Sequence, residues 1–176
     1  MKIAQSKTRE QFPLSYKKIM KKTIANTIAI TLLFLVIWGF LVYMLNTLGQ
    51  GITSGWFGIT TFGIFGLLFF VILFTYLYER WYFAVYFYDL ANDFIQIKKG
   101  PITPREITIP YERIQDVYVD QDIFDRIFGL YDVHLSSATV SSGMEAHIDG
   151  VDKKGAEGLR AILLETIKQR ISKNKV

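Results

Sequence analysis

Residues 23–78 form a run of 56 positions without a single Asp, Glu, Lys, Arg or His. The rest of the chain is too short to bury such a run inside a water-soluble core. Residues 24–48 and 56–78 are each long enough, at about 1.5 Å per helical residue, to cross a hydrocarbon layer of about 30 Å. The short connection between them, residues 49–55, forces an antiparallel pair. We therefore predict a transmembrane helical hairpin over residues 23–80.

The charges that flank the hairpin predict its orientation. Residues 1–22 contain seven Lys or Arg and one Glu, whereas the connection between the spans contains no positive charge. Positively charged flanks are retained in the cytoplasm, so we expect a multi-pass cell-membrane protein with both termini cytoplasmic. A cleaved signal peptide is not expected, because the first apolar segment is far longer than a signal-peptide core.

The basic N-terminal tail, residues 1–22, has two interpretations. Its lysines next to the first span are candidates for contact with anionic lipid headgroups. They would equally serve only to set the topology. These candidate membrane-surface residues are Lys17, Lys18, Lys21 and Lys22.

Composition excludes several functional classes. The basic charge belongs to the tail and residues 79–176 are slightly acidic, so we expect no nucleic-acid partner. The absence of cysteine excludes disulfides and thiolate metal sites within this chain. The spans carry no ionisable group, which argues against a proton relay or a charged pore and favours an anchor.

Glycines of the second span share one helical face and would let another helix approach closely. Either the first span packs there, or a second copy of the chain does. These candidate helix-packing residues are Gly55, Gly58, Gly63 and Gly66.

The remaining chain, residues 81–172, changes to a pattern of short strands. We expect strands over residues 81–88, 94–98, 105–109, 114–121, 131–137 and 145–148, with a short helix over 122–128. Asp152 is a good N-cap for a terminal helix whose apolar stripe repeats with the helical period. The expected fold class is α+β: an antiparallel sheet or open barrel that is closed by the terminal helix.

Three spaced motifs carry a family resemblance. They are Ile-Lys-Lys-Gly at residues 97–100, Ile-Pro-Tyr-Glu-Arg-Ile at 109–114 and Asp-Arg-Ile-Phe-Gly-Leu at 125–130. Together they resemble the bacterial pleckstrin-homology-like (PH-like) domain, in particular the membrane-anchored group once called domain of unknown function 304. The resemblance covers about residues 20–170. It implies a transmembrane hairpin followed by a PH-like antiparallel β-roll with a C-terminal helix, and it implies no catalytic residues.

Candidate ligand sites are weak. The loop at residues 89–93, where pleckstrin-homology domains hold phosphoinositides, contains two Asp and no Lys or Arg, so a phosphate would be repelled. His134 and His147 would come close if their strands pair, and with Asp132 or Glu145 they would make a conceivable metal site. Because two histidines without ligand spacing are a weak signal, we expect no metal and no cofactor. Arg113 and Arg126 lie beside several acidic residues and are expected to form ion pairs rather than to bind a ligand.

Aromatic residues after the second span suggest an interaction surface. If residues 81–88 form a strand, only one of its two faces can line the core of a small domain, so the other would pack on the membrane, on a neighbour or on the chain's own tail. The candidate interface residues are Tyr82, Tyr86 and Tyr88.

These features predict a binding or scaffold module rather than an enzyme. We expect it to self-assemble, or to dock another membrane protein, at the cytoplasmic face of the membrane. A lipid-headgroup-binding accessory subunit and a small channel or transporter component are the alternatives.

Overall fold

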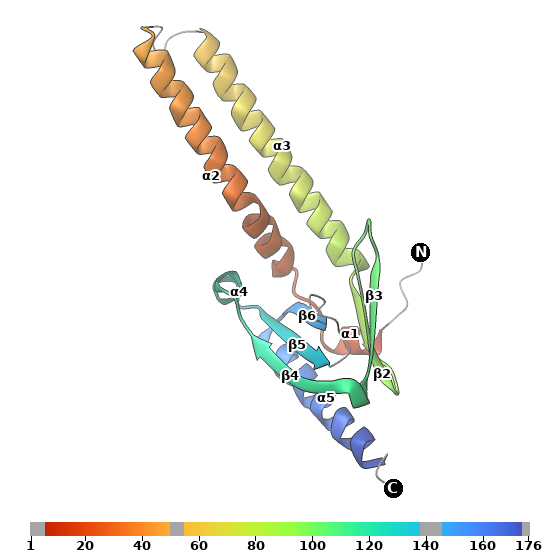
Figure 1. The fold of residues 1–176 in the computed structure, drawn as a ribbon. Helices are drawn as coiled ribbons and strands as arrows, with labels where there is room; N and C mark the ends of the chain where they lie inside the picture. The colour runs from red at the N-terminus through yellow and green to blue at the C-terminus, as the bar shows by residue number, and fades with distance from the viewer. Residues whose placement is uncertain (1–5, 50–54, 138–145, 174–176) are drawn as a thin grey trace. The chain divides into compact units, whose positions relative to one another are not determined.

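The computed structural model describes residues 6–49, 55–137 and 146–173, and the chain forms two compact units (Figure 1). One unit is Lys22–Arg80. The other combines the N-terminal segment through Lys21 with the chain from Trp81 onward. The segment expected as a separate tail is therefore grouped with the C-terminal half of the chain.

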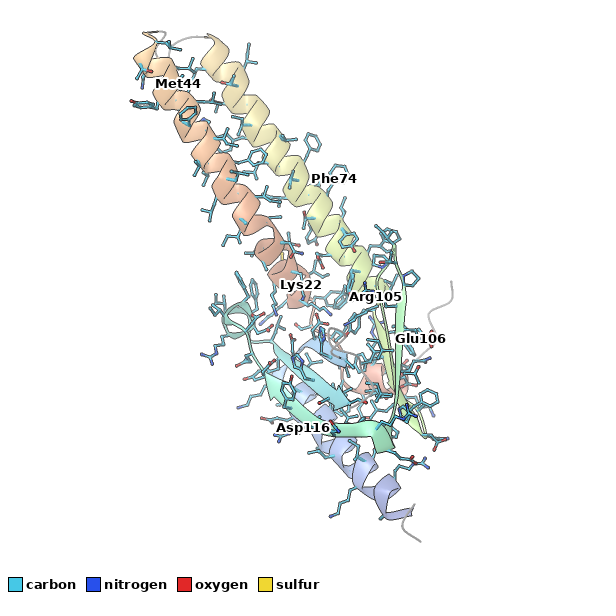
Figure 2. All side chains as sticks on the ribbon, in the orientation of Figure 1. Lys22, Met44, Phe74, Arg105, Glu106 and Asp116 are labelled. Carbon is cyan, nitrogen blue, oxygen red and sulfur yellow. The ribbon has the colours of Figure 1, made fainter. Side chains whose placement is uncertain are left out.

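The first unit is built from helix α2 (Lys17–Thr47) and helix α3 (Gly55–Val85), which run side by side (Figure 1). Both helices are long and apolar enough to cross a membrane. Trp38 Nε1 donates to Thr61 Oγ1 at 3.2 Å, and its ring meets Phe65 edge-on at 5.8 Å. Most large apolar side chains point outward instead, as the labelled Phe74 and Met44 do in Figure 2. The unit thus presents an apolar outer surface, as the composition predicts.

The second unit contains two three-stranded antiparallel sheets. One holds β1 (Phe87–Leu90), β2 (Phe94–Lys99) and β3 (Arg105–Pro110). After the single 3-10 turn η1 (Tyr111–Arg113), the other holds β4 (Ile114–Asp120), β5 (Tyr131–Ser137) and β6 (Ala146–Val151). Helix α4 (Ile123–Phe128) links β4 to β5, and helix α5 (Lys153–Lys173) follows β6 and packs on β4 and β5 (Figure 1). The α+β fold expected from the sequence is confirmed.

Alternating residues of the strands line the core of this unit. Val117 on β4 and Val133 on β5 are buried, while their neighbours Asp116 and Tyr118 face outward. The apolar stripe of α5 closes this core, since Leu159 and Leu163 are fully buried. Burial of these side chains is the main stabilising contribution of the fold. Large side chains that are fully buried on the strands are Tyr88, Ile95, Ile97, Ile109 and Ile148, and Tyr86, between α3 and β1, is also fully buried.

Two turns depend on glycine, at Gly100 and Gly129 of the sequence motifs. Gly100 follows β2 with a φ of 98°, and a Cβ there would lie 2.5 Å from the carbonyl oxygen of Thr103. Gly129 ends α4 in the left-handed conformation, with a φ of 67°. Residues with a Cβ rarely adopt such φ values, so both positions require glycine.

The N-terminal segment packs on this unit as an additional element. It contains helix α1 (Lys7–Gln11), and Leu14 then forms a β-bridge with Val151 at the end of β6. The N–H of Ser15 donates to the carbonyl oxygen of Gly150 at 2.8 Å. Leu14 is only 5 % exposed. The segment thereby extends the edge of the sheet at β6, whose residues lie more than 130 positions later in the chain.

The strand expected over residues 81–88 is wrong over residues 81–86. Helix α3 continues to Val85, and the strand β1 begins only at Phe87. Although the aromatic residues from Trp81 to Val85 have a high β-propensity, the helix that precedes them propagates at little cost, because each added residue gains one hydrogen bond.

Candidate functional site

The first turns of α2 carry two lysines that are buried in the second unit. Lys18 and Lys21 are three residues apart and therefore lie on one face of the helix. Lys18 Nζ is 2.6 Å from Asp149 Oδ1 and 3.1 Å from the carbonyl oxygen of the same residue. It also lies 3.9 Å from the centre of the Tyr86 ring, within the range of a cation–π interaction. Both charged side chains of the Lys18–Asp149 pair are almost completely shielded from water.

Lys21 binds three carboxylates at the ends of α4 and β5. Its Nζ is 2.6 Å from Asp125, 2.9 Å from Asp122 and 4.0 Å from Asp132. Asp122 and Asp125 also form a capping box that begins α4. The same carboxylates therefore fix the start of α4 and hold the start of α2. We call Lys18, Lys21, Asp122, Asp125, Asp132 and Asp149 the ionic cluster.

The ionic cluster corrects the interpretation of the four lysines as a membrane-surface set. Lys18 and Lys21 are 2 % and 3 % exposed and are occupied by carboxylates, so they do not present charge to lipid headgroups. Lys17 is exposed and donates to the carbonyl oxygen of Phe128 at 3.3 Å, and Lys22 is half-buried. The four lysines differ because of the helical spacing: Lys18 and Lys21, three residues apart, lie on the buried face of α2. The arginine pairing also differs from expectation, since Asp122 and Asp125 bond Lys21 rather than Arg126.

Asp132 is a largely buried carboxyl that lies among other negative charges of the cluster. Burial, Asp149 and Asp125 together raise the pKa of Asp132 to about 6, although the N–H of Gly150 and Lys21 oppose this. Burial also works against ionisation of Asp122, but hydrogen bonds from Lys21 and from the Asp125 N–H hold the pKa of Asp122 below its usual value. The cluster therefore contains two carboxyl groups, Asp122 and Asp132, whose pKa values are shifted in opposite directions.

We expect Asp132→Asn to change how stability depends on pH. Because the pKa of Asp132 is higher in the folded than in the unfolded chain, the folded protein binds more protons between about pH 4 and 6, and its stability falls as pH rises through this window. The variant lacks this loss and keeps an acceptor for the Gly150 N–H. Above pH 6 the variant should have gained up to about 3 kcal/mol on the parent, at about 1.4 kcal/mol per pKa unit. Urea unfolding in detergent at several pH values measures this, and parallel pH profiles would contradict it.

The two histidines come together as the strand pairing predicts. His134 on β5 and His147 on β6 are cross-strand partners, and their rings stack at 5.4 Å. Asp120, Asp132 and His134 have ligand atoms within 4.8 Å of one another. However, His134 Nε2 already contacts Asp120 at 3.1 Å, and the ammonium of Lys21 lies close to Asp132. A cation would have to displace these partners, which already occupy the carboxylates; Glu145 lies outside the described residues.

A polar cavity of about 360 Å³ lies beside the turn between β1 and β2. Its cationic residue, Arg170, pairs with Asp93 at 2.9 Å and donates to the carbonyl oxygen of Asn92. Asp89, near the end of β1, accepts hydrogen bonds from the hydroxyls of Ser6 and Thr8. The acidic loop therefore binds the N-terminal segment and α5, and nothing in it favours a phosphate. Residues lining the cavity include Thr8, Gln11, Asn92, Tyr111, Thr166 and Arg170.

The expected tyrosine interface is also corrected. Tyr86 and Tyr88 are fully buried, and their hydroxyls donate to the carbonyl oxygens of His147 and Phe12. Burial raises the pKa of both tyrosines, so their hydroxyls stay protonated as donors. Tyr82 is half-buried on α3. These side chains stabilise the unit from within, since the residues expected to form a two-faced strand are partly helical.

The glycine face of α3 is open. A Cβ at Gly58, Gly63 or Gly66 would meet no heavy atom of the described residues within 4 Å, and the same holds for Gly55. The contacts that α2 makes with α3 come instead from larger side chains such as Trp38. The structure therefore shows no use of these glycines inside the hairpin.

Comparison with known proteins identifies the family. No curated protein and no solved structure matches the chain. The bacterial PH domain family matches residues 12–167, so the match includes both long helices and begins within the N-terminal segment that packs on β6. Because this match covers most of the chain, and the fold has the expected strands and terminal helix, the protein belongs to the bacterial PH domain family.

Proposed function

We propose that this chain is a membrane-anchored PH-like scaffold that binds other proteins, in the first place further copies of itself, and carries out no catalysis. The anchor is the pair α2 and α3, whose length and apolar surface suit a bilayer. The lysines in the first turns of α2 favour a cytoplasmic position for the PH-like unit. Within that unit, the ionic cluster holds Lys18 and Lys21 of α2 to the carboxylates of Asp149 and Asp125.

The open glycine face of α3 is the observation that carries self-assembly. In a bilayer, helices associate through close packing rather than through the hydrophobic effect, and glycines permit the closest approach. Here the glycines face no described neighbour within the hairpin. A second copy of α3 would fill this space without disturbing contacts already made. A partner membrane protein is the second candidate for the same face.

The test is chemical crosslinking in native membranes, followed by mass identification of the joined species. We expect a ladder at multiples of about 20 kDa. Replacing Gly63 and Gly66 by Leu should abolish the ladder, because the larger side chains block close approach of a second helix. The hairpin itself should tolerate them, since each site has open space.

Gly39→Leu is the matched control, because Gly39 lies in α2 and also has open surroundings. It should leave the ladder unchanged. Equal loss in both variants would contradict the assignment to α3. A single recurrent foreign protein in place of the ladder would establish partner docking instead, and uncrosslinked chain alone would contradict both.

A further inference from the structure

The polar cavity of about 360 Å³ lies entirely within the second unit, between α1, the turn that joins β1 to β2, η1 and the second half of α5. Its walls come from segments that are far apart in the sequence, residues 8–12, 90–92, 111 and 162–170. A volume of about 300–1,000 Å³ is usual for a ligand pocket. The cavity is therefore large enough for a small ligand and belongs to one folded unit.

The charges at the cavity favour an uncharged ligand. Arg170 is the only charged side chain among the described residues that line it. Its guanidinium pairs with Asp93 at 2.9 Å and donates to the carbonyl oxygen of Asn92. An anionic ligand would have to displace Asp93 and approach Asp89 at the end of β1, whereas a cationic ligand would meet Arg170. Neither charge is therefore complementary to the cavity.

Three carboxamides offer hydrogen bonds to such a ligand. Gln11 and Asn92 are exposed, and within the described residues neither side chain has a hydrogen-bond partner. Gln169 donates to Glu165 at 3.2 Å and keeps its oxygen as an acceptor. A carboxamide presents a donor and an acceptor side by side. A peptide residue in an extended conformation presents its own N–H and C=O in one direction, as in an antiparallel ladder, and is a matching partner.

Apolar side chains also line the cavity. Phe12, Leu90 and Ile162 are half-buried there. Tyr111 is only 1 % exposed, and its hydroxyl donates to the carbonyl oxygen of Ala91 at 2.8 Å, which fixes this wall. An apolar side chain between two main-chain amides suits such a lining better than a sugar, whose hydroxyl groups point outward around its ring.

We propose that this cavity binds a short, uncharged peptide segment of a partner protein in an extended conformation. An apolar side chain of the segment packs against Phe12 and Ile162, and its main-chain amides bond the carboxamides of Gln11 and Asn92. These residues differ from the glycines of α3 that carry the proposed self-assembly. The peptide site therefore goes beyond self-assembly and does not depend on it.

The probe is the blocked tripeptide N-acetyl-Ala-Leu-Ala-amide, titrated into the full chain in detergent and followed by saturation-transfer NMR. Gln11→Met and Asn92→Leu each remove a carboxamide at an exposed position, so the fold should be retained. Gln115→Met is the matched control, because Gln115 is exposed on β4 and does not line the cavity. We expect saturable binding that each cavity variant weakens about three- to tenfold, the usual effect of one lost hydrogen bond, and that the control leaves unchanged.

Equal binding by all three variants, or no saturable binding to the parent, overturns the proposal. If N-acetylglucosamine binds and the tripeptide does not, the cavity is a sugar site and the peptide assignment is wrong. A probe with aspartate in place of leucine should not bind, and equal binding of this probe would contradict an uncharged ligand. The crosslinking ladder should be unchanged in Gln11→Met, so failure of the peptide site is distinguished from failure of self-assembly.

Discussion

Replacing Lys21 by Met is expected to destabilise the PH-like unit by about 3–5 kcal/mol, the typical effect of removing one member of a buried ion pair. Lys21 neutralises Asp125, which is fully buried, and it also contacts Asp122 and Asp132. Without the ammonium group, the carboxylate of Asp125 stays buried without its cationic partner. The loss of unfolding free energy is measured by urea titration of the detergent-solubilised protein at neutral pH, with a spectroscopic signal of the β-strands as the readout.

Two further variants make this result specific. Lys17→Met removes an exposed lysine of the same helix, whose recorded partner is only a carbonyl oxygen, and should change stability by no more than about 0.5 kcal/mol. Adding Asp125→Asn to Lys21→Met should recover part of the loss, because the uncompensated charge is removed as well. Equal effects of Lys17→Met and Lys21→Met would show that the ionic cluster does not stabilise the fold.

Leu14→Ala should cost about 2–5 kcal/mol, the range for truncating a large buried side chain. Leu14 lies outside the strands and α5, yet it is 5 % exposed and bridges to Val151. A loss of this size would show that the N-terminal segment is part of the hydrophobic core rather than a detachable tail. The measurement is again the free energy of unfolding, from urea titration of the full chain in detergent.

Leu164→Ala is the matched control, since it makes the same chemical change at a leucine of α5 that is 45 % exposed. Its effect should stay within about 0.5 kcal/mol. A cost for Leu14→Ala as small as that of the control would mean that the unit is stable without the N-terminal segment.

Much of the fold follows from the sequence because its signals are local. The run without charges predicts α2 and α3, and alternation predicts β2, β4 and β5 close to their observed bounds. Asp122 and Gly129 mark the two ends of α4 as capping rules require. Asp152 accepts a hydrogen bond from the N–H of Gly155 at the start of α5, as an N-cap should.

The candidate site was less accessible from the sequence because its contacts are long-range. Lys18 bonds a carboxylate 131 residues away, and nothing in the local pattern around a lysine identifies so distant a partner. Two signals in the sequence were available. Acidic residues outnumber basic residues in and around the last three strands, so some of them need partners elsewhere, and Lys18 and Lys21 are spaced to share a helical face. The boundary at Val85 was misplaced because the aromatic residues before it favour strands, whereas the continuing helix overrides that preference.

The ionic cluster has a consequence for the order of events during synthesis. Lys18 and Lys21 leave the ribosome long before Asp122, Asp132 and Asp149, roughly 5–25 s earlier at translation rates of about 5–20 residues per second. During that interval both lysines are without these partners, and their charge is available to orient the nascent spans. Asp122 and Asp125, the closest partners of Lys21, emerge with α4, and Asp149, the partner of Lys18, emerges only with β6. The same two side chains would thus first direct insertion and afterwards lock the finished unit in place, two roles separated in time.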